Sequence, residues 1–273
     1  MIYKKILLKD YFSYIKSEAS LTSYCISNHE EYPYDVKRRT ILVIPGGGYE
    51  FVSKREAEPV AVKFLAHNFN VFVLDYTVGR FKFPYPTIEA FAAMAYIRQH
   101  ADEYNVDLNY VGVCGFSAGG HLAASISNYY KEEQYQKMLG VKESDLRIDF
   151  SILVYPVLTT DRIKGHGGTA ERITQDRKDL EEYFDIVNHI NPYFPPTYMW
   201  STEEDVDVPP ECSQIFKKNL DSLHIKNEYH LFPKGRHGGA TCDELTTDPE
   251  EVARIVEAKA WIDQASAFIN SLK

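Results

Sequence analysis

The segment Tyr110-Val-Gly-Val-Cys-Gly-Phe-Ser-Ala-Gly-Gly120 is the most informative part of the sequence. Residues 110–114 are an apolar run typical of a buried strand, and a helical pattern follows over residues 117–130. Between them lies Gly115-Phe-Ser117-Ala-Gly119, a G-x-S-x-G pattern. A serine at a sharp strand-to-helix turn needs small neighbours, because the two backbones approach closely there. The stretch therefore predicts a nucleophilic serine, Ser117, and the alternative is a Gly/Ser-rich helix start that only caps its helix.

Apolar runs and helical patterns alternate on both sides of this stretch. The other expected strands are residues 40–45, 70–75, 150–155, 197–200 and 228–232. The other expected helices are residues 56–68, 87–103, 210–222 and 250–271. Near-continuous apolar runs are typical of strands buried on both faces of a parallel sheet, and their alternation with helices favours a doubly wound α/β fold. We therefore predict one α/β domain over residues 1–273, with residues 3–8 and 23–27 as a leading antiparallel pair.

The interval 156–196 breaks this alternation, because it is longer than a plain crossover requires. It contains Gly165-His-Gly-Gly168 and a charged stretch that predicts a helix around residues 175–187. Part of it is expected to fold over the sheet edge formed by the carboxyl ends of the strands, where open α/β sheets bind ligands. Two interpretations stay open: a small lid that shapes a substrate pocket, or a surface excursion.

Composition excludes several classes of partner. The formal net charge is −9, whereas nucleic acids and anionic membranes call for a basic face.

The N-terminus lacks the apolar stretch of a secretory signal, and no apolar run is long enough to cross a membrane, so a cytoplasmic protein is expected. The four cysteines follow no metal-ligand spacing, so we expect reduced thiols and no metal: Cys25, Cys114, Cys212 and Cys242.

A glycine-rich turn, Ile44-Pro-Gly-Gly-Gly-Tyr49, follows the first long strand. It has neither the G-x-G-x-x-G pattern nor the Lys-Ser/Thr of a phosphate-binding loop. Glycine lets the backbone come within hydrogen-bond reach of a tetrahedral oxygen, so the turn predicts an oxyanion hole. Its expected donors are the amides of Gly47 and Gly48 together with that of Ala118. The alternative is a glycine turn with a conformational role only.

One histidine of the nine, His237, has the position expected of a general base. It lies in the loop Phe232-Pro-Lys-Gly-Arg-His-Gly-Gly239, directly after the last strand and at the sheet edge that carries Ser117. His121 follows Ser117 on the same helix and points poorly for proton abstraction. His230 lies inside a strand and is expected to be a core residue, and His166 lies in the 156–196 interval.

An acidic turn follows the strand at residues 197–200 and supplies the third member of a catalytic triad. Asp205 and Asp207 both qualify, and Glu203 and Glu204 stay open because glutamate can take this role. A solvated acidic loop is the alternative for all four. The chain order serine, acid, histidine is that of α/β-hydrolases and differs from those of chymotrypsin and subtilisin.

Four segments carry a family resemblance: Pro45-Gly-Gly-Gly-Tyr49, the nine residues 115–123, residues 200–210 and residues 232–238. Together they resemble the acetyl esterase and acetyl-xylan-esterase-like branch of the α/β-hydrolases, close to the hormone-sensitive-lipase-like esterases. The resemblance covers roughly residues 40 to 270. The branch's T-x-x-D-x-x-V-P pattern aligns with residues 202–209 and favours Asp205 over Asp207. Pro45 stands where many relatives carry histidine.

The resemblance implies an α/β-hydrolase fold, a mostly parallel sheet of about eight strands with helices on both faces. It also implies a serine carboxylesterase that acts on short-chain esters, in particular acetyl groups of sugars, through an acyl-enzyme and without a cofactor. Tyr49, Tyr76 and His166 are candidate substrate-binding residues, since tyrosine offers a sugar an apolar ring with a polar tip, although plain packing is the alternative for both tyrosines. Two other functions stay open: an amidase or peptidase of the same fold, and a non-catalytic hydrolase-fold binding protein.

Overall fold

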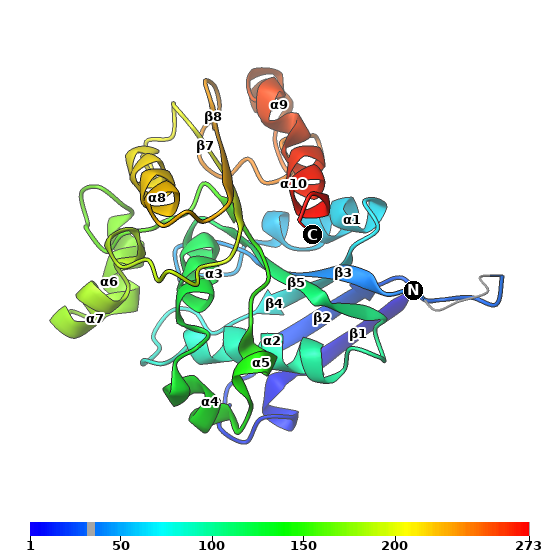
Figure 1. The fold of residues 1–273 in the computed structure, drawn as a ribbon. Coiled ribbons are helices and arrows are strands. Elements are labelled where there is room, and N and C mark those ends of the chain that lie inside the picture. Colours follow the sequence, from blue (N-terminus) through cyan, green and yellow to red (C-terminus); the bar gives the residue numbers. More distant parts are fainter. Residues whose placement is uncertain (32–35, 273) are drawn as a thin grey trace.

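The apolar runs of the sequence form one eight-stranded sheet in the computed structural model, which describes residues 1–31 and 36–272 (Figure 1). The strands are β1 (Ile2–Leu7), β2 (Ser20–Cys25), β3 (Arg38–Ile44), β4 (Asn70–Asp75), β5 (Val106–Phe116), β6 (Ser151–Val154), β7 (Thr197–Thr202) and β8 (Asn227–Phe232). Their order across the sheet is β1-β2-β4-β3-β5-β6-β7-β8. All neighbours from β4 to β8 pair in parallel, whereas β1 with β2 and β2 with β4 pair antiparallel. The predicted doubly wound sheet and its leading antiparallel pair are both confirmed.

Helices cover both faces of this sheet. The α-helices are α1 (Glu58–Ala66), α2 (Thr87–Gln99), α3 (Ala118–Tyr129), α4 (Glu133–Leu139), α5 (Glu143–Leu146), α6 (Gly167–Thr174), α7 (Lys178–Tyr183), α8 (Glu211–Ser222), α9 (Pro249–Arg254) and α10 (Trp261–Asn270). The 3₁₀ helices are η1 (Leu8–Asp10), η2 (Lys54–Glu56), η3 (Ile186–Asn188) and η4 (Val256–Ala260). Figure 1 shows α1 and α10 on one face of the sheet and α2 and α3 on the other.

Two apolar clusters hold these layers together. On one face Phe91, Leu122 and Phe216 pack the helices α2, α3 and α8 against the sheet. On the opposite face Phe64 of α1 and Trp261 of α10 pack against each other, with ring centroids 5.9 Å apart. Burying each side chain of this size stabilises the fold by about 2 kcal/mol, so the sheet is a rigid support for the loops at its edge.

The prediction of one continuous helix over residues 250–271 is wrong. The segment divides into α9, η4 and α10, and the break falls at Ile255. The side chain of Ile255 packs against the loop after β8, where a Cβ placed on Gly235 would lie only 2.7 Å from its Cδ1. Glu251, one turn earlier, accepts a hydrogen bond from the backbone N–H of Arg236. Contacts with the loop that carries His237 therefore interrupt the helical pattern.

The predicted helix around residues 175–187 is also wrong in its bounds. The structure has α6 and α7 on either side of Gln175 and Asp176, whose φ angles are +54° and +56°. Two successive residues in the left-handed region cannot continue an α-helix, so the chain turns there. The helices α4 and α5, between β5 and β6, had no counterpart in the sequence prediction.

Candidate active site

Ser117 lies at the turn between β5 and α3, with φ +52° and ψ −117°. A serine in this region of backbone space is strained, which is the local conformation expected of a nucleophile at a strand-to-helix turn. Two glycines make the turn sterically possible. A Cβ on Gly115 would lie 2.3 Å from the carbonyl oxygen of Gly119, and a Cβ on Gly119 would lie 2.2 Å from that of Ile44. The backbones at this turn thus approach too closely for a side chain at Gly115 or Gly119.

The structure brings Ser117, His237 and Asp205 together from the ends of three strands. The Nε2 atom of His237 lies 2.8 Å from Oγ of Ser117, and Nδ1 lies 2.6 Å from Oδ2 of Asp205. These contacts fit a ring that donates from Nδ1 to the carboxylate and accepts the serine hydroxyl at Nε2. The other oxygen of Asp205 accepts from the backbone N–H groups of Asp207 and Val208, at 3.1 and 2.8 Å. The carboxylate is buried and fixed in orientation.

The other three acidic candidates lie elsewhere. Glu204 pairs with Lys234 at 2.8 Å and also with Arg254, on the outer side of the turn. Glu203 is exposed, and Asp207 is exposed at the mouth of the cavity described below. The geometry therefore selects Asp205 as the partner of His237.

The glycine loop lies directly against the serine. A Cβ on Gly46 would approach Cβ of Ser117 to 3.0 Å. Gly47 and Gly48 have φ angles of +121° and +63°, which a residue with a side chain adopts only with strain. Within residues 1–31 and 36–272, neither of these two amides donates a hydrogen bond to another part of the chain. Ala118 is the first residue of α3, where helical N–H groups have no partner within the helix. The three predicted donors are thus available for an oxyanion.

A cavity of about 640 Å³ opens above these groups. Its walls are polar and charged, and they come from the glycine loop with η2, from the 156–196 interval and from the loops after β7 and β8. The lining residues are Gly47, Gly48, Glu50, Phe51, Ser53, Lys54, Arg55, Glu56, Ser117, His166, Arg172, Asp207, His237 and Gly238. His166 therefore lines the same cavity as Ser117 and His237.

The predicted substrate contacts of Tyr49 and Tyr76 are wrong. Both side chains are buried, and neither lines this cavity. The hydroxyl of Tyr76 donates to the carbonyl oxygen of Pro45 at 2.7 Å, and the hydroxyl of Tyr49 lies 2.9 Å from Nδ1 of His121. Tyr76 therefore holds the glycine loop from its buried side, and the ring of Tyr49 lies in the core beside His121.

His121 and His230 both form hydrogen bonds away from Ser117. His121 is buried, with Nε2 3.0 Å from the carbonyl oxygen of Phe184, and burial lowers the pKa of this imidazole to about 4. His230 lies on β8, at the edge of the sheet, and its Nε2 is 2.7 Å from Oε1 of Glu228. It is half-buried, so the expectation of a core residue is wrong.

The low pKa of His121 predicts a pH dependence of stability. An unfolded histidine has a pKa near 6.5, so between about pH 6.5 and pH 4 the unfolded chain binds a proton that the folded chain does not. The stabilising contribution is complete above pH 6.5 and is lost as the pH falls through 4. Between pH 7 and pH 5 we expect this group to lower the free energy of unfolding by about 2 kcal/mol. Urea unfolding of the wild type and of His121→Gln at both pH values measures it, and an equal pH dependence in the two proteins would contradict the assignment.

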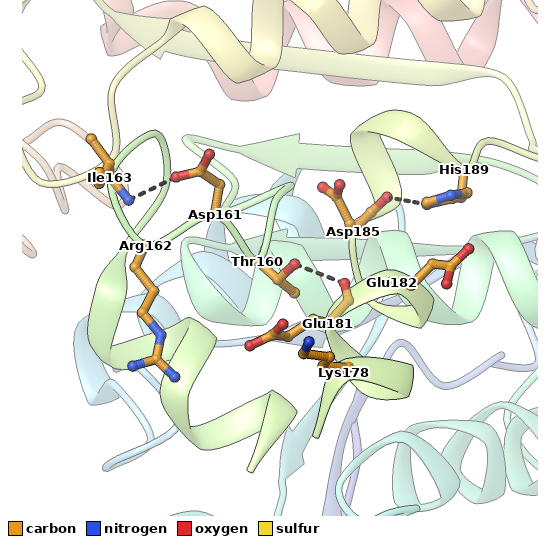
Figure 2. A pocket seen from close by; sticks show the side chains of 9 residues that line it. All are labelled: Thr160, Asp161, Arg162, Ile163, Lys178, Glu181, Glu182, Asp185 and His189. Carbon is orange, nitrogen blue, oxygen red and sulfur yellow. Dashed lines mark hydrogen bonds between the residues drawn. The ribbon is translucent and has the colours of Figure 1, made fainter. Parts of the chain in front are cut away.

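The 156–196 interval supplies part of the cavity wall through α6. His166 caps this helix by accepting from the backbone N–H of Thr169, and Arg172 pairs with Glu50 at 2.7 Å. These contacts place α6 beside the glycine loop. A second hollow, with a volume of about 620 Å³, lies in the same interval. The side chains that line it come from residues 160–163, from α7 and from residues 185–189 (Figure 2). Thr160 donates to the backbone oxygen of Glu181 across it, and it contains none of the three residues brought together above.

Several lining residues were not singled out by the sequence. Glu56 is the first residue of the helix expected over residues 56–68, Arg55 directly precedes it, and Arg172 lies in the 156–196 interval. The sequence could have indicated Arg55 and Glu56 by their position alone, because both closely follow the glycine loop. In the part of the chain that the structure describes, no group of histidine, cysteine and acidic side chains could hold a metal ion. The same residues include no helix with the length and apolarity needed to span a bilayer.

Comparisons with known proteins bear on the fold and the family of this chain. The BD-FAE family model matches residues 30–220, a span that includes Ser117 and Asp205 and ends before His237. Endo-1,4-beta-xylanase B of Butyrivibrio fibrisolvens is 35% identical over 217 residues, which are 75% of this chain and 33% of that protein. The acetylxylan esterase of Xylanibacter ruminicola is 26% identical over 216 residues, 76% of this chain and 42% of that protein.

Among solved structures, the acetyl ester-xyloside bifunctional hydrolase from Caldicellulosiruptor lactoaceticus superposes with a TM-score of 0.82 at 27% identity. The match covers 98% of this chain and 96% of that chain. The chain spans about a third to two fifths of the length of the two curated relatives, whereas it matches the solved structure over nearly its whole length.

Proposed function

Because the chain belongs to the BD-FAE family and has the α/β-hydrolase fold, we propose that it is a serine carboxylesterase with Ser117, His237 and Asp205 as its catalytic triad. The observation that carries the proposal is the pair of contacts on one imidazole, 2.8 Å to the serine oxygen and 2.6 Å to the buried carboxylate. A hydroxyl becomes nucleophilic at neutral pH when a neighbouring base takes its proton, and the base acts well when a third group fixes its tautomer.

The reaction follows from the positions of these groups. His237 removes the proton of Ser117 as Oγ attacks the ester carbonyl, and the amides of Gly47, Gly48 and Ala118 stabilise the tetrahedral oxyanion. His237 then protonates the departing alkoxide, which leaves an acyl-enzyme on Ser117. Water, deprotonated by the same histidine, attacks the acyl carbonyl. His237 then returns this proton to Oγ of Ser117 as the bond to the acyl group breaks, which releases the acid and the free enzyme.

The substrate we propose is a short-chain ester, in particular an acetyl ester of a sugar. Two similarities support it, since one relative is an acetylxylan esterase and one solved structure is an acetyl ester-xyloside hydrolase. The walls of the cavity also suit a polyhydroxylated alcohol, because most of the lining side chains are polar or charged. Phe51, which is 60% exposed, offers the apolar face of a sugar ring a surface to stack on.

The 156–196 interval is proposed to act as a lid within a single domain that includes the whole chain. His166 and Arg172 support this, because both come from the interval and both line the cavity with Ser117. The pair formed by Arg172 and Glu50 holds α6 over the glycine loop.

A matched set of substrates tests the proposed function. We expect hydrolysis of p-nitrophenyl acetate and of acetylated xylose, and a rate that falls at least about 10-fold from the acetyl to the octanoyl p-nitrophenyl ester. p-Nitroacetanilide carries the same acyl and aryl groups on an amide, so it separates an esterase from an amidase. A folded protein that turns over none of these esters would contradict the proposal, and faster cleavage of the anilide would favour the amidase.

A further inference from the structure

The carboxylate of Glu56 lines the same cavity as Ser117 and His237 and, unlike those of Glu50 and Asp207, is buried. Glu56 ends η2 and is only 4% exposed, and in residues 1–31 and 36–272 no lysine, arginine or histidine forms an ion pair with it. Burying a carboxylate is costly unless hydrogen bonds replace the lost water. The hydrogen-bond donors to Glu56 therefore indicate what its buried carboxylate does in the fold.

The two oxygens of Glu56 contact the two halves of the site. Oε2 accepts the backbone N–H of Gly46 at 2.8 Å, directly before the proposed oxyanion donors. Oε1 accepts the hydroxyl of Tyr155 at 2.8 Å. Burial and the nearby Glu56 raise the pKa of Tyr155 well above its ordinary value, so the phenol remains a donor. The carboxylate thus joins the glycine loop to the residue that follows β6.

Tyr155 continues this connection to the histidine loop. Its hydroxyl oxygen accepts the backbone N–H of Ala240 at 2.9 Å, three residues after His237. Its ring packs edge-on against the imidazole of His237, with centroids 4.9 Å apart. The carbonyl oxygen of Ala240 accepts the indole N–H of Trp261 at 2.9 Å, which fixes the far end to a buried side chain at the start of α10.

From this chain of contacts we propose that Glu56 is a positioning residue that sets the oxyanion loop and the catalytic base at a fixed separation. The inference rests on the proposed function, because it assigns Glu56 a part in the same reaction. Glu56 acts through Gly46 and Tyr155 and does not itself touch the reacting atoms. Glu56 therefore contributes to stabilising the transition state, in which the oxyanion donors and the base must both be in place.

The substitution Glu56→Gln tests this with little change of shape. Glutamine offers one oxygen and one NH₂ group, so it can accept from Gly46 or from Tyr155 but not from both. We expect kcat for p-nitrophenyl acetate to fall about 10- to 100-fold while KM stays within about threefold, since only transition-state alignment is lost. Glu58→Gln is the matched control: Glu58 lies two residues away, also accepts from a tyrosine, Tyr24, and does not line the cavity. This control should keep the wild-type kcat.

A double-mutant cycle separates positioning from general weakening of the fold. Tyr155→Phe removes the hydroxyl but leaves the ring on His237, and it should also lower kcat. Because both substitutions break the same chain of contacts, the double variant should be no slower than the slower single variant. A kcat for Glu56→Gln within twofold of wild type, a loss confined to KM, or multiplicative effects in the cycle would each overturn the inference.

The cycle also keeps this inference separate from the proposed function. A wild type without esterase activity would refute the proposed function, whereas an active wild type with a fully active Glu56→Gln variant would refute the role of Glu56 alone. If Glu56→Gln fails to fold, as judged by circular dichroism, Tyr155→Phe carries the test, and a wild-type kcat in that variant would overturn the inference.

Discussion

Replacing Ser117 by alanine is expected to lower kcat for p-nitrophenyl acetate by about 10⁴-fold or more. The hydroxyl of Ser117 is the group at this turn that His237 contacts, with 2.8 Å between Oγ and Nε2, and its loss removes the nucleophile. Without it the amides of the glycine loop and α3 still bind the carbonyl oxygen, so a small residual rate above that of water is expected. Alanine removes a single atom at a position whose conformation is fixed by Gly115 and Gly119, and the fold should be retained.

Ser125→Ala is the control for this substitution. Ser125 lies two turns further along α3, is buried, and donates its hydroxyl to the carbonyl oxygen of His121 at 2.8 Å. Its replacement should cost about 1 kcal/mol of stability and leave kcat near the wild-type value. Initial rates under saturating substrate give kcat for the wild type, Ser117→Ala and Ser125→Ala, and these three values are compared. Equal rates for the wild type and Ser117→Ala would remove the basis of the proposed function.

The fold and the meeting of the three residues were predictable because they depend on local patterns. Ser117, Asp205 and His237 each follow an apolar run, and the carboxyl ends of parallel strands meet at one edge of a sheet. The alternation of apolar runs and helical patterns predicts the order of strands and helices along the chain, and this prediction needs no information on distant contacts. The glycines of the serine motif were predictable for the same reason, since the close approach of Gly115 to Gly119 is a consequence of the turn itself.

The errors concern features set by distant contacts. The break at Ile255 arises from packing on Gly235, 20 residues earlier in the chain, and a helical periodicity carries no sign of it. Tyr49 stands beside the glycine loop and was expected to contact substrate, but its ring is buried and its hydroxyl contacts His121, which lies 72 residues further along the chain. Glu56 looked like an ordinary residue at a helix start. Its importance follows from Tyr155, 99 residues away, which the sequence could not place beside it.

Changing Asp205 to asparagine is the second substitution with a large expected effect, about 10⁴-fold in kcat. Oδ1 of Asp205 accepts two backbone N–H groups, from Asp207 and Val208, so the amide oxygen of the asparagine would take that position. The NH₂ group would then face Nδ1 of His237, where it can only donate. The imidazole would have to accept at Nδ1 and carry its proton on Nε2, and in that tautomer it cannot deprotonate Ser117.

Asp207→Asn distinguishes this electronic effect from a general need for negative charge in the turn. Both substitutions remove one charge, but the carboxylate of Asp207 is exposed at the cavity mouth and does not bond to His237. We therefore expect a change in kcat below about fivefold for Asp207→Asn, beside the loss of about 10⁴-fold for Asp205→Asn. Steady-state kinetics on the two variants, with thermal unfolding to confirm that both are folded, give the comparison. The reverse ranking would transfer the role of triad acid to Asp207, and equal small effects would mean that the tautomer of His237 is held by some other group.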